Sequence, residues 1–104
     1  MKYRFKEIHF SLKELNYTFI NLYLECVYES GDAFGAEKQN VGAVTNQEEC
    51  VEKCAELKIK DMSINAAVVD AKTGKQCSCV KKATARRRNP DLNSCFFKMD
   101  GEKF

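Results

Sequence analysis

The chain has 104 residues and a formal net charge of +2 at pH 7, with six cysteines, one proline and no tryptophan. This length fits one domain with a modest core, and six cysteines in so short a chain are typical of a disulfide-rich protein from an oxidising compartment rather than of a cytosolic protein with reduced thiols. The charge is unevenly spread: residues 25–61 carry nine acidic and four basic side chains, whereas residues 71–90 carry seven basic and no acidic ones. We therefore expect an acidic side and a basic side of the molecule.

Residues 1–24 are predicted to form an N-terminal extension of the domain. Its large apolar residues recur at helical spacing: Phe5, Ile8, Leu12, Leu15 and Phe19. This stripe indicates a helical or extended segment that packs on the domain, or alternatively a helix that docks on a membrane or a partner. The segment lacks the uninterrupted apolar core and the cleavage site of a secretory signal, and its apolar run is too short to span a membrane. Asn16 begins a glycosylation motif that matters if the chain is secreted.

Residues 47–57 predict the helix of the domain. Asn46 is an N-cap residue, and Glu48 and Glu49 follow in the first turn, where the helix dipole favours acidic side chains. Cys50 and Cys54 are four residues apart, so they share one helix face and lie roughly 6 Å apart along the axis.

The rest of the chain predicts short strands joined by turns. Residues 22–28 read as a strand with Cys26, residues 41–44 as at most a short strand, and residues 64–69 and 76–81 as a hairpin around the turn at 72–75. A loop over residues 81–89 then leads to a last strand, residues 94–98, which carries Cys95, and a tail over 99–104. Cys77 and Cys79 point to one face of their strand, roughly 6.6 Å apart.

The spacing of the helix cysteines matches that of the strand cysteines. Two neighbouring disulfides can therefore fasten the helix to the strand, and the remaining pair, Cys26 and Cys95, would close a loop of about 70 residues, worth on the order of 4 kcal/mol. The sequence thus predicts a small, disulfide-rich α+β domain over residues 25–98.

The order of these cysteines resembles the PAN/apple superfamily, and the Cys77-Ser78-Cys79 element is similar to its WSC-like members. The resemblance covers about residues 25–97, including the Asn-Ala-Ala strand at 65–67; WSC domains carry a glycine after the C-x-C, where Val80 stands here. It implies one helix packed on a twisted antiparallel sheet and three disulfides, which are Cys26–Cys95, Cys50–Cys79 and Cys54–Cys77. Geometry alone also allows Cys50–Cys77 with Cys54–Cys79, depending on whether the helix and the strand run the same way.

Zinc is the other use of the same sulfur atoms. Cys50, Cys54, Cys77 and Cys79 could form a four-thiolate site in an intracellular interaction domain. Structural zinc sites more often use C-x2-C knuckles, and Cys26 and Cys95 fit a disulfide better, so we expect disulfides and no bound metal.

Catalysis has little support in the sequence. His9 is the only histidine, and Glu48, Glu49 and Glu52 fit a solvated helix face. No glycine-rich phosphate loop, nucleophile elbow or histidine-containing metal motif occurs. We therefore expect a protein that is not an enzyme and needs no cofactor.

The basic segment is the candidate binding surface. Its cations are Lys72, Lys75, Lys81, Lys82, Arg86, Arg87 and Arg88. They suit sulfated glycans or other anionic partners, although such charges are also common on solvated loops. Nucleic acid is not expected, because no aromatic residue lies between Cys79 and Pro90 to stack on bases. A groove beside Tyr28, Asp32 and Phe34 is a second candidate.

We therefore expect an extracellular recognition or adhesion module. The PAN/apple resemblance implies that it binds a glycan or an extracellular protein and is secreted or part of a larger protein. An inhibitor or toxin-like antagonist on the same scaffold is the alternative, and it would bind one protease or receptor tightly. An adhesion module would instead bind weakly and multivalently. The sequence leaves the ligand, the parent protein and the oligomeric state open.

Overall fold

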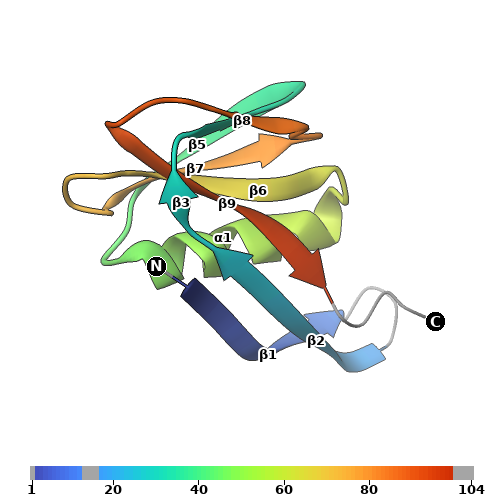
Figure 1. Ribbon diagram of the computed structural model, residues 1–104. Coiled ribbons are helices and arrows are strands. Elements are labelled where there is room, and N and C mark those ends of the chain that lie inside the picture. The colour runs from blue at the N-terminus through green and yellow to red at the C-terminus, as the bar shows by residue number, and fades with distance from the viewer. Residues whose placement is uncertain (1, 13–16, 100–104) are drawn as a thin grey trace.

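The computed structural model describes residues 2–12 and 17–99, and within them the side chains of residues 25–98. In this part of the chain, one helix packs on a seven-stranded antiparallel sheet, and a separate two-stranded ribbon packs on the other face (Figure 1). The predicted disulfide-rich α+β fold is thereby confirmed. Across the sheet the strands follow the order β1-β2-β9-β6-β7-β5, and β3 pairs with β9. The elements are β1 (Lys2–Leu12), β2 (Tyr17–Val27), β3 (Glu29–Ser30), β4 (Asp32–Phe34), β5 (Glu37–Ala43), α1 (Gln47–Lys60), β6 (Ile64–Asp70), β7 (Gln76–Lys81), β8 (Ala85–Arg87) and β9 (Leu92–Met99).

The helix begins where the sequence predicts it. The Asn46 side chain accepts a hydrogen bond from the Glu49 amide (2.9 Å), and the Glu49 carboxylate accepts one from the Thr45 amide (3.1 Å). The first bond satisfies an amide that the first turn leaves without a partner, and the second holds the residue that precedes the N-cap. The helix continues to Lys60, beyond the predicted end, because buried Lys58 donates to two backbone carbonyls of the following loop and strand, at 3.0 and 2.8 Å.

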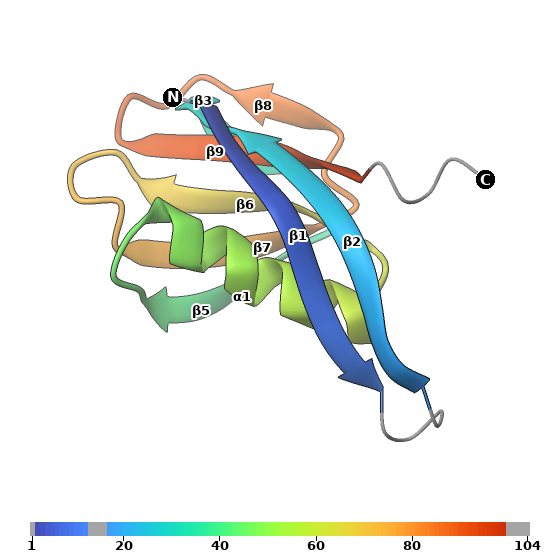
Figure 2. The same ribbon diagram turned by 90° about the horizontal axis from the view of Figure 1, so that it is seen from below.

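The N-terminal extension is a long β-hairpin, so the strand alternative of the prediction is right and the helical one is wrong (Figure 2). The register accounts for the first interval of the helix-like spacing, from Phe5 to Ile8. Phe5 pairs with Leu24 and Ile8 pairs with Leu22, and a bulge lies between the two pairs. The extra residue of a bulge interrupts the regular alternation of a strand, so a spacing of three between Phe5 and Ile8 is compatible with a strand. Leu15 and Asn16 lie outside the described residues.

Three disulfides are present, and the resemblance-derived pairing of the helix cysteines is wrong. Cys26 bonds to Cys95 as predicted, whereas Cys50 bonds to Cys77 and Cys54 to Cys79. This is the second arrangement that geometry left open.

The direction of the chain accounts for this pairing. Residues 61–63 alone separate α1 from β6, so β6 runs back against the helix (Figure 2). Strand β7 is antiparallel to β6 and therefore runs in the same direction as α1. The first cysteine of the helix thus meets the first cysteine of β7, and the second meets the second.

Two apolar clusters fill the space on either side of the sheet. Alternate residues of β6 divide between them, as the period of a strand requires. Ala67 and Val69 join the cluster beneath α1, which contains all six half-cystines, whereas Ala66 and Val68 join a smaller cluster with Ala33 of β4. The ribbon is therefore held on the sheet by mostly small side chains.

The remaining boundaries differ modestly from prediction. Strand β5 is longer than the predicted strand at 41–44, and β9 begins before residue 94. The basic segment, predicted as a loop, contains β8. Within the described residues, no helix is both long and apolar enough to cross a membrane.

Candidate ligand-binding surface

The candidate surface is built on the β4–β8 ribbon, which comprises Asp32–Phe34 and Ala85–Arg87. At its base the Asn65 side chain bonds both backbone groups of Ala83, accepting from its amide (2.7 Å) and donating to its carbonyl (2.9 Å). Gly35 passes so close to β7 that a Cβ there would lie 2.5 Å from the Lys81 carbonyl oxygen. Only glycine fits this approach, so the ribbon starts from a fixed position.

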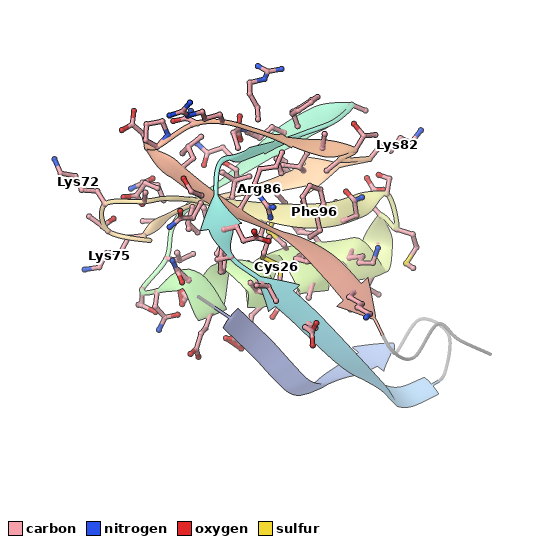
Figure 3. The ribbon with its side chains drawn as sticks, in the orientation of Figure 1. Cys26, Lys72, Lys75, Lys82, Arg86 and Phe96 are labelled. Carbon is pink, nitrogen blue, oxygen red and sulfur yellow. A yellow bond between two sulfur atoms is a disulfide. The ribbon has the colours of Figure 1, made fainter. Side chains whose placement is uncertain are left out.

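Arg86 fastens the ribbon to the sheet. Its Nε donates to the Ser94 hydroxyl (2.9 Å) and its Nη2 to the Ser94 carbonyl (3.0 Å), while Nη1 lies 3.4 Å from the Glu29 carboxylate. The guanidinium also lies over the Phe96 ring, 5.1 Å from its centroid (Figure 3). Ser94 is fully buried, so Arg86 satisfies polar groups that water cannot reach and has a structural position.

Arg87, Arg88 and Lys82 are exposed on or beside the ribbon. The Arg87 guanidinium lies over the Phe34 ring on the paired strand, 4.7 Å from its centroid. Among the side chains that the structure describes, no acidic group forms an ion pair with any of these three cations. Lys82 adopts a left-handed backbone conformation (φ 51°) at the point where the chain leaves β7.

This geometry suits the binding of an anion. A guanidinium that stacks on a ring covers one of its faces, and its N–H donors still point outward in the plane. The ring thus restricts the arginine without using the donors that a sulfate, phosphate or carboxylate oxygen would accept.

Lys81 is placed differently, because acidic residues from elsewhere in the chain neutralise it. Its Nζ lies 3.0 Å from the Asp61 carboxylate and 3.8 Å from that of Glu37. Hydrogen bonds from Ser63 and the contact with Lys81 lower the pKa of Asp61 to about 2, and the same carboxylate raises the pKa of Lys81. Lys81 therefore belongs to a local ion-pair network.

Lys72 and Lys75 lie on the β6–β7 turn, away from Lys82 and Arg86 (Figure 3). The turn is organised by Asp70, whose carboxylate accepts hydrogen bonds from the Thr73, Lys75 and Gln76 amides. These bonds hold the pKa of Asp70 well below its usual range. A depression of about 560 Å³ beside the turn is lined by Asp70, Ala71, Lys72, Pro90 and Asp91.

The seven predicted cations therefore occupy three places rather than one patch: the turn, the Lys81 ion-pair network and the ribbon. The second predicted candidate divides as well. Phe34 and Asp32 lie on the ribbon, where Asp32 pairs with Lys38 at 2.6 Å. Tyr28 is buried in the main core, and its hydroxyl donates to the Gln47 carbonyl (3.1 Å). Phe34 thus joins the basic segment, whereas Tyr28 lies apart.

The cysteines are the strongest potential metal ligands among the described residues. The sulfur atoms of Cys50, Cys54 and Cys77 lie within 4.8 Å of one another. Zinc binds thiolates, and each of these sulfurs is bonded to another sulfur. In the oxidised protein this cluster therefore fastens the helix to the sheet.

The structure brings no catalytic arrangement to the acidic helix residues among the side chains that it describes. The side chain of His9 lies outside the described ones, and Glu49 caps the helix. The expectation of a non-enzymatic protein stays a prediction.

Comparison of the chain with protein-family models, curated proteins and solved structures finds no match in any of the three. The PAN/apple resemblance therefore stays a prediction.

Sequence reasoning missed three residues that shape the surface. Asn65 was noted only as part of a strand, Ser94 only as the start of one, and Phe34 was not connected with the arginines. Each meets its partner across the fold, at sequence separations of 8 residues for Ser94, 18 for Asn65 and 53 for Phe34. Periodicity and local motifs carry no information on such contacts.

Proposed function

We propose that this chain is an extracellular recognition module that binds the anionic groups of sulfated glycans through Arg87, Arg88 and Lys82, which lie on or beside the ribbon. The observation that carries the proposal is the stacked Arg87, which is exposed, has no acidic partner among the described residues and is oriented by Phe34. The function implied by the PAN/apple resemblance, glycan or protein binding, is of the same class.

The scaffold supports this proposal. Three disulfides with no free cysteine are typical of proteins that work in oxidising compartments. They join β2 to β9 and the helix to β7, so the ribbon rests on a frame that loses little conformational freedom when a ligand binds.

The cations that form ion pairs within the fold differ from those that are available to a ligand. Arg86 and Lys81 have carboxylate partners, so their charges are partly compensated within the fold. Arg87, Arg88 and Lys82 have none in the part of the chain described, and cations that bind a polyanion release the counterions condensed on it. Binding through the ribbon should therefore be strongly salt-dependent.

The test is retention on heparin for three forms of the oxidised protein: the natural chain, Arg87→Ala/Arg88→Ala and Lys72→Ala/Lys75→Ala. The two variants lose the same charge. If the proposal is right, the ribbon variant elutes at much lower salt, and the slope of log affinity against log salt falls by about 2. The turn variant should stay close to the natural chain.

Equal losses for the two variants would mean that retention reflects net charge alone and would overturn the proposal. Retention unaffected by either variant would remove the ribbon as the binding surface. Intact mass, together with an amide spectrum of unchanged dispersion, would verify that each variant keeps its three disulfides and its fold.

A further inference from the structure

Strand β5 is a free edge of the sheet. It ends the strand order, and in the described part of the chain it pairs with β7 alone. Most of its side chains are exposed. A bulge lies between Asn40 and Gly42, where the Gly42 amide donates to the Asn40 side chain (2.9 Å). The other outward backbone amides and carbonyls of a free edge can bond another extended chain.

Strand β5 lies beside the helix (Figure 2), and a groove lies between the two. It measures about 340 Å³ and is lined by Val41 of β5 and by Lys53, Glu56, Leu57 and Lys60 of α1. These helix positions follow the spacing of one helix face. Val41 and Leu57 are partly buried against the main core, so they form an apolar floor.

The groove has a basic rim. Lys53 and Lys60 flank Glu56, and among the described side chains none of these three forms an ion pair. The two lysines are seven positions apart, roughly 10.5 Å along the helix axis. Alternate residues of an added strand point to one side, so positions four apart span roughly 13 Å, a separation that flexible lysine side chains can match.

We propose that this groove binds an extended segment of a partner protein, which adds to the sheet along β5. On the side that faces α1, the segment would carry an apolar residue between two acidic ones. The apolar residue would lie on Val41 and Leu57, and the carboxylates would meet Lys53 and Lys60. Backbone hydrogen bonds supply affinity in such strand addition, and the alternate side chains supply specificity.

This surface is distinct from the ribbon. The helix and the ribbon cover opposite faces of the sheet, so a ligand on one leaves the other open. Peptide binding at this groove and glycan binding at the ribbon can therefore be tested separately.

The experiment is an amide NMR titration of the full oxidised chain with a blocked peptide of sequence Thr-Glu-Thr-Val-Thr-Glu-Thr. Its two glutamates and its valine share one side of a strand. We expect shifts at residues 37–43 and 53–60, and slower amide exchange along β5. The variant Lys53→Glu/Lys60→Glu should bind about tenfold more weakly, because two exposed attractions become repulsions. The matched variant Lys72→Glu/Lys75→Glu, with the same charge change on the distant turn, should bind like the natural chain.

Three results would overturn the inference. The first is an absence of binding at millimolar peptide, or shifts confined to other surfaces. The second is equal binding by the peptide in which both glutamates are lysine. The third is concentration-dependent dimerisation of the chain with protection of β5 in the absence of peptide, which would identify a second copy as the occupant of the edge.

Discussion

The three disulfides should contribute unequally to stability, because two of them are close neighbours. Cys50–Cys77 and Cys54–Cys79 fasten the same helix to the same strand, and both lie within the loop that Cys26–Cys95 closes. The cost of deleting a bridge therefore depends on how large a loop it closes while the other two remain.

The magnitudes follow from loop-closure entropy. With the helix bridges intact, Cys26–Cys95 closes a path of about 42 residues, from Cys26 to Cys50 and from Cys77 to Cys95, which is worth about 4 kcal/mol. With Cys50–Cys77 intact, Cys54–Cys79 closes a path of only about 6 residues, which is worth about 2 kcal/mol. The cysteines of these two bridges, Cys26 with Cys95 and Cys54 with Cys79, are all fully buried. Replacing either pair with alanine therefore leaves similar cavities, whose cost largely cancels when the two variants are compared.

The assay is urea unfolding without reductant of Cys26→Ala/Cys95→Ala and Cys54→Ala/Cys79→Ala. The first variant should lose about 2 kcal/mol more of its unfolding free energy than the second. Once Cys54–Cys79 is absent, deletion of Cys50–Cys77 should cost about 3.5 kcal/mol, because that bridge then closes its own loop of 27 residues. Equal losses for the first two variants, with additive effects of the two helix bridges, would refute the nested arrangement.

Two further predictions concern single polar groups. The substitution Arg86→Lys keeps the charge but loses the two hydrogen bonds to buried Ser94. The free energy of unfolding measured in urea should therefore fall by about 1–3 kcal/mol. An unchanged free energy would mean that Arg86 does not fasten the ribbon. Folding lowers the pKa of both Asp61 and Asp70, from a usual value of 3.8 to about 2 for Asp61. The ionised carboxylates therefore stabilise the fold fully above about pH 4, and this contribution is lost as the pH falls toward 2. Thermal unfolding against pH should therefore show the largest difference between the natural chain and Asp70→Asn above pH 4; a difference that grows below pH 4 would contradict this assignment.

Local patterns in the sequence predicted much of the frame. Asn46 and the acidic first turn located the start of the helix, and β7 occupies the predicted residues 76–81. The even number and matched spacing of the cysteines led to three disulfides, and the structure contains three. In each case the physical cause lies within a few residues of the feature.

The errors arose where the cause is distant in sequence or involves an irregular strand. The spacing of Phe5 and Ile8 is helical in a regular chain, but a bulge makes it compatible with a strand. Which β7 cysteine bonds to Cys50 and which to Cys54 depends on the relative direction of the helix and β7. The short link from the helix to β6 determines that direction. Because the helix extends past its predicted end at residue 57, this three-residue link was not apparent from the sequence.

The candidate surface was the least predictable part. Residues 71–90 contain no acidic residue, but Asp61, Glu37 and Glu29 come from other elements to pair with Lys81 and Arg86. The fold thus removes two cations from the predicted basic segment, places two more on the turn, and leaves Arg87, Arg88 and Lys82 at the ribbon.

The most direct test of the ribbon as the recognition surface is an amide NMR titration of the oxidised chain with a heparin-derived oligosaccharide. If the ribbon binds the glycan, the shifts concentrate at residues 82–88 and at Phe34, where the stacked Arg87 lies. Shifts centred on Lys72 and Lys75, or on the groove between β5 and α1, would contradict binding at the ribbon.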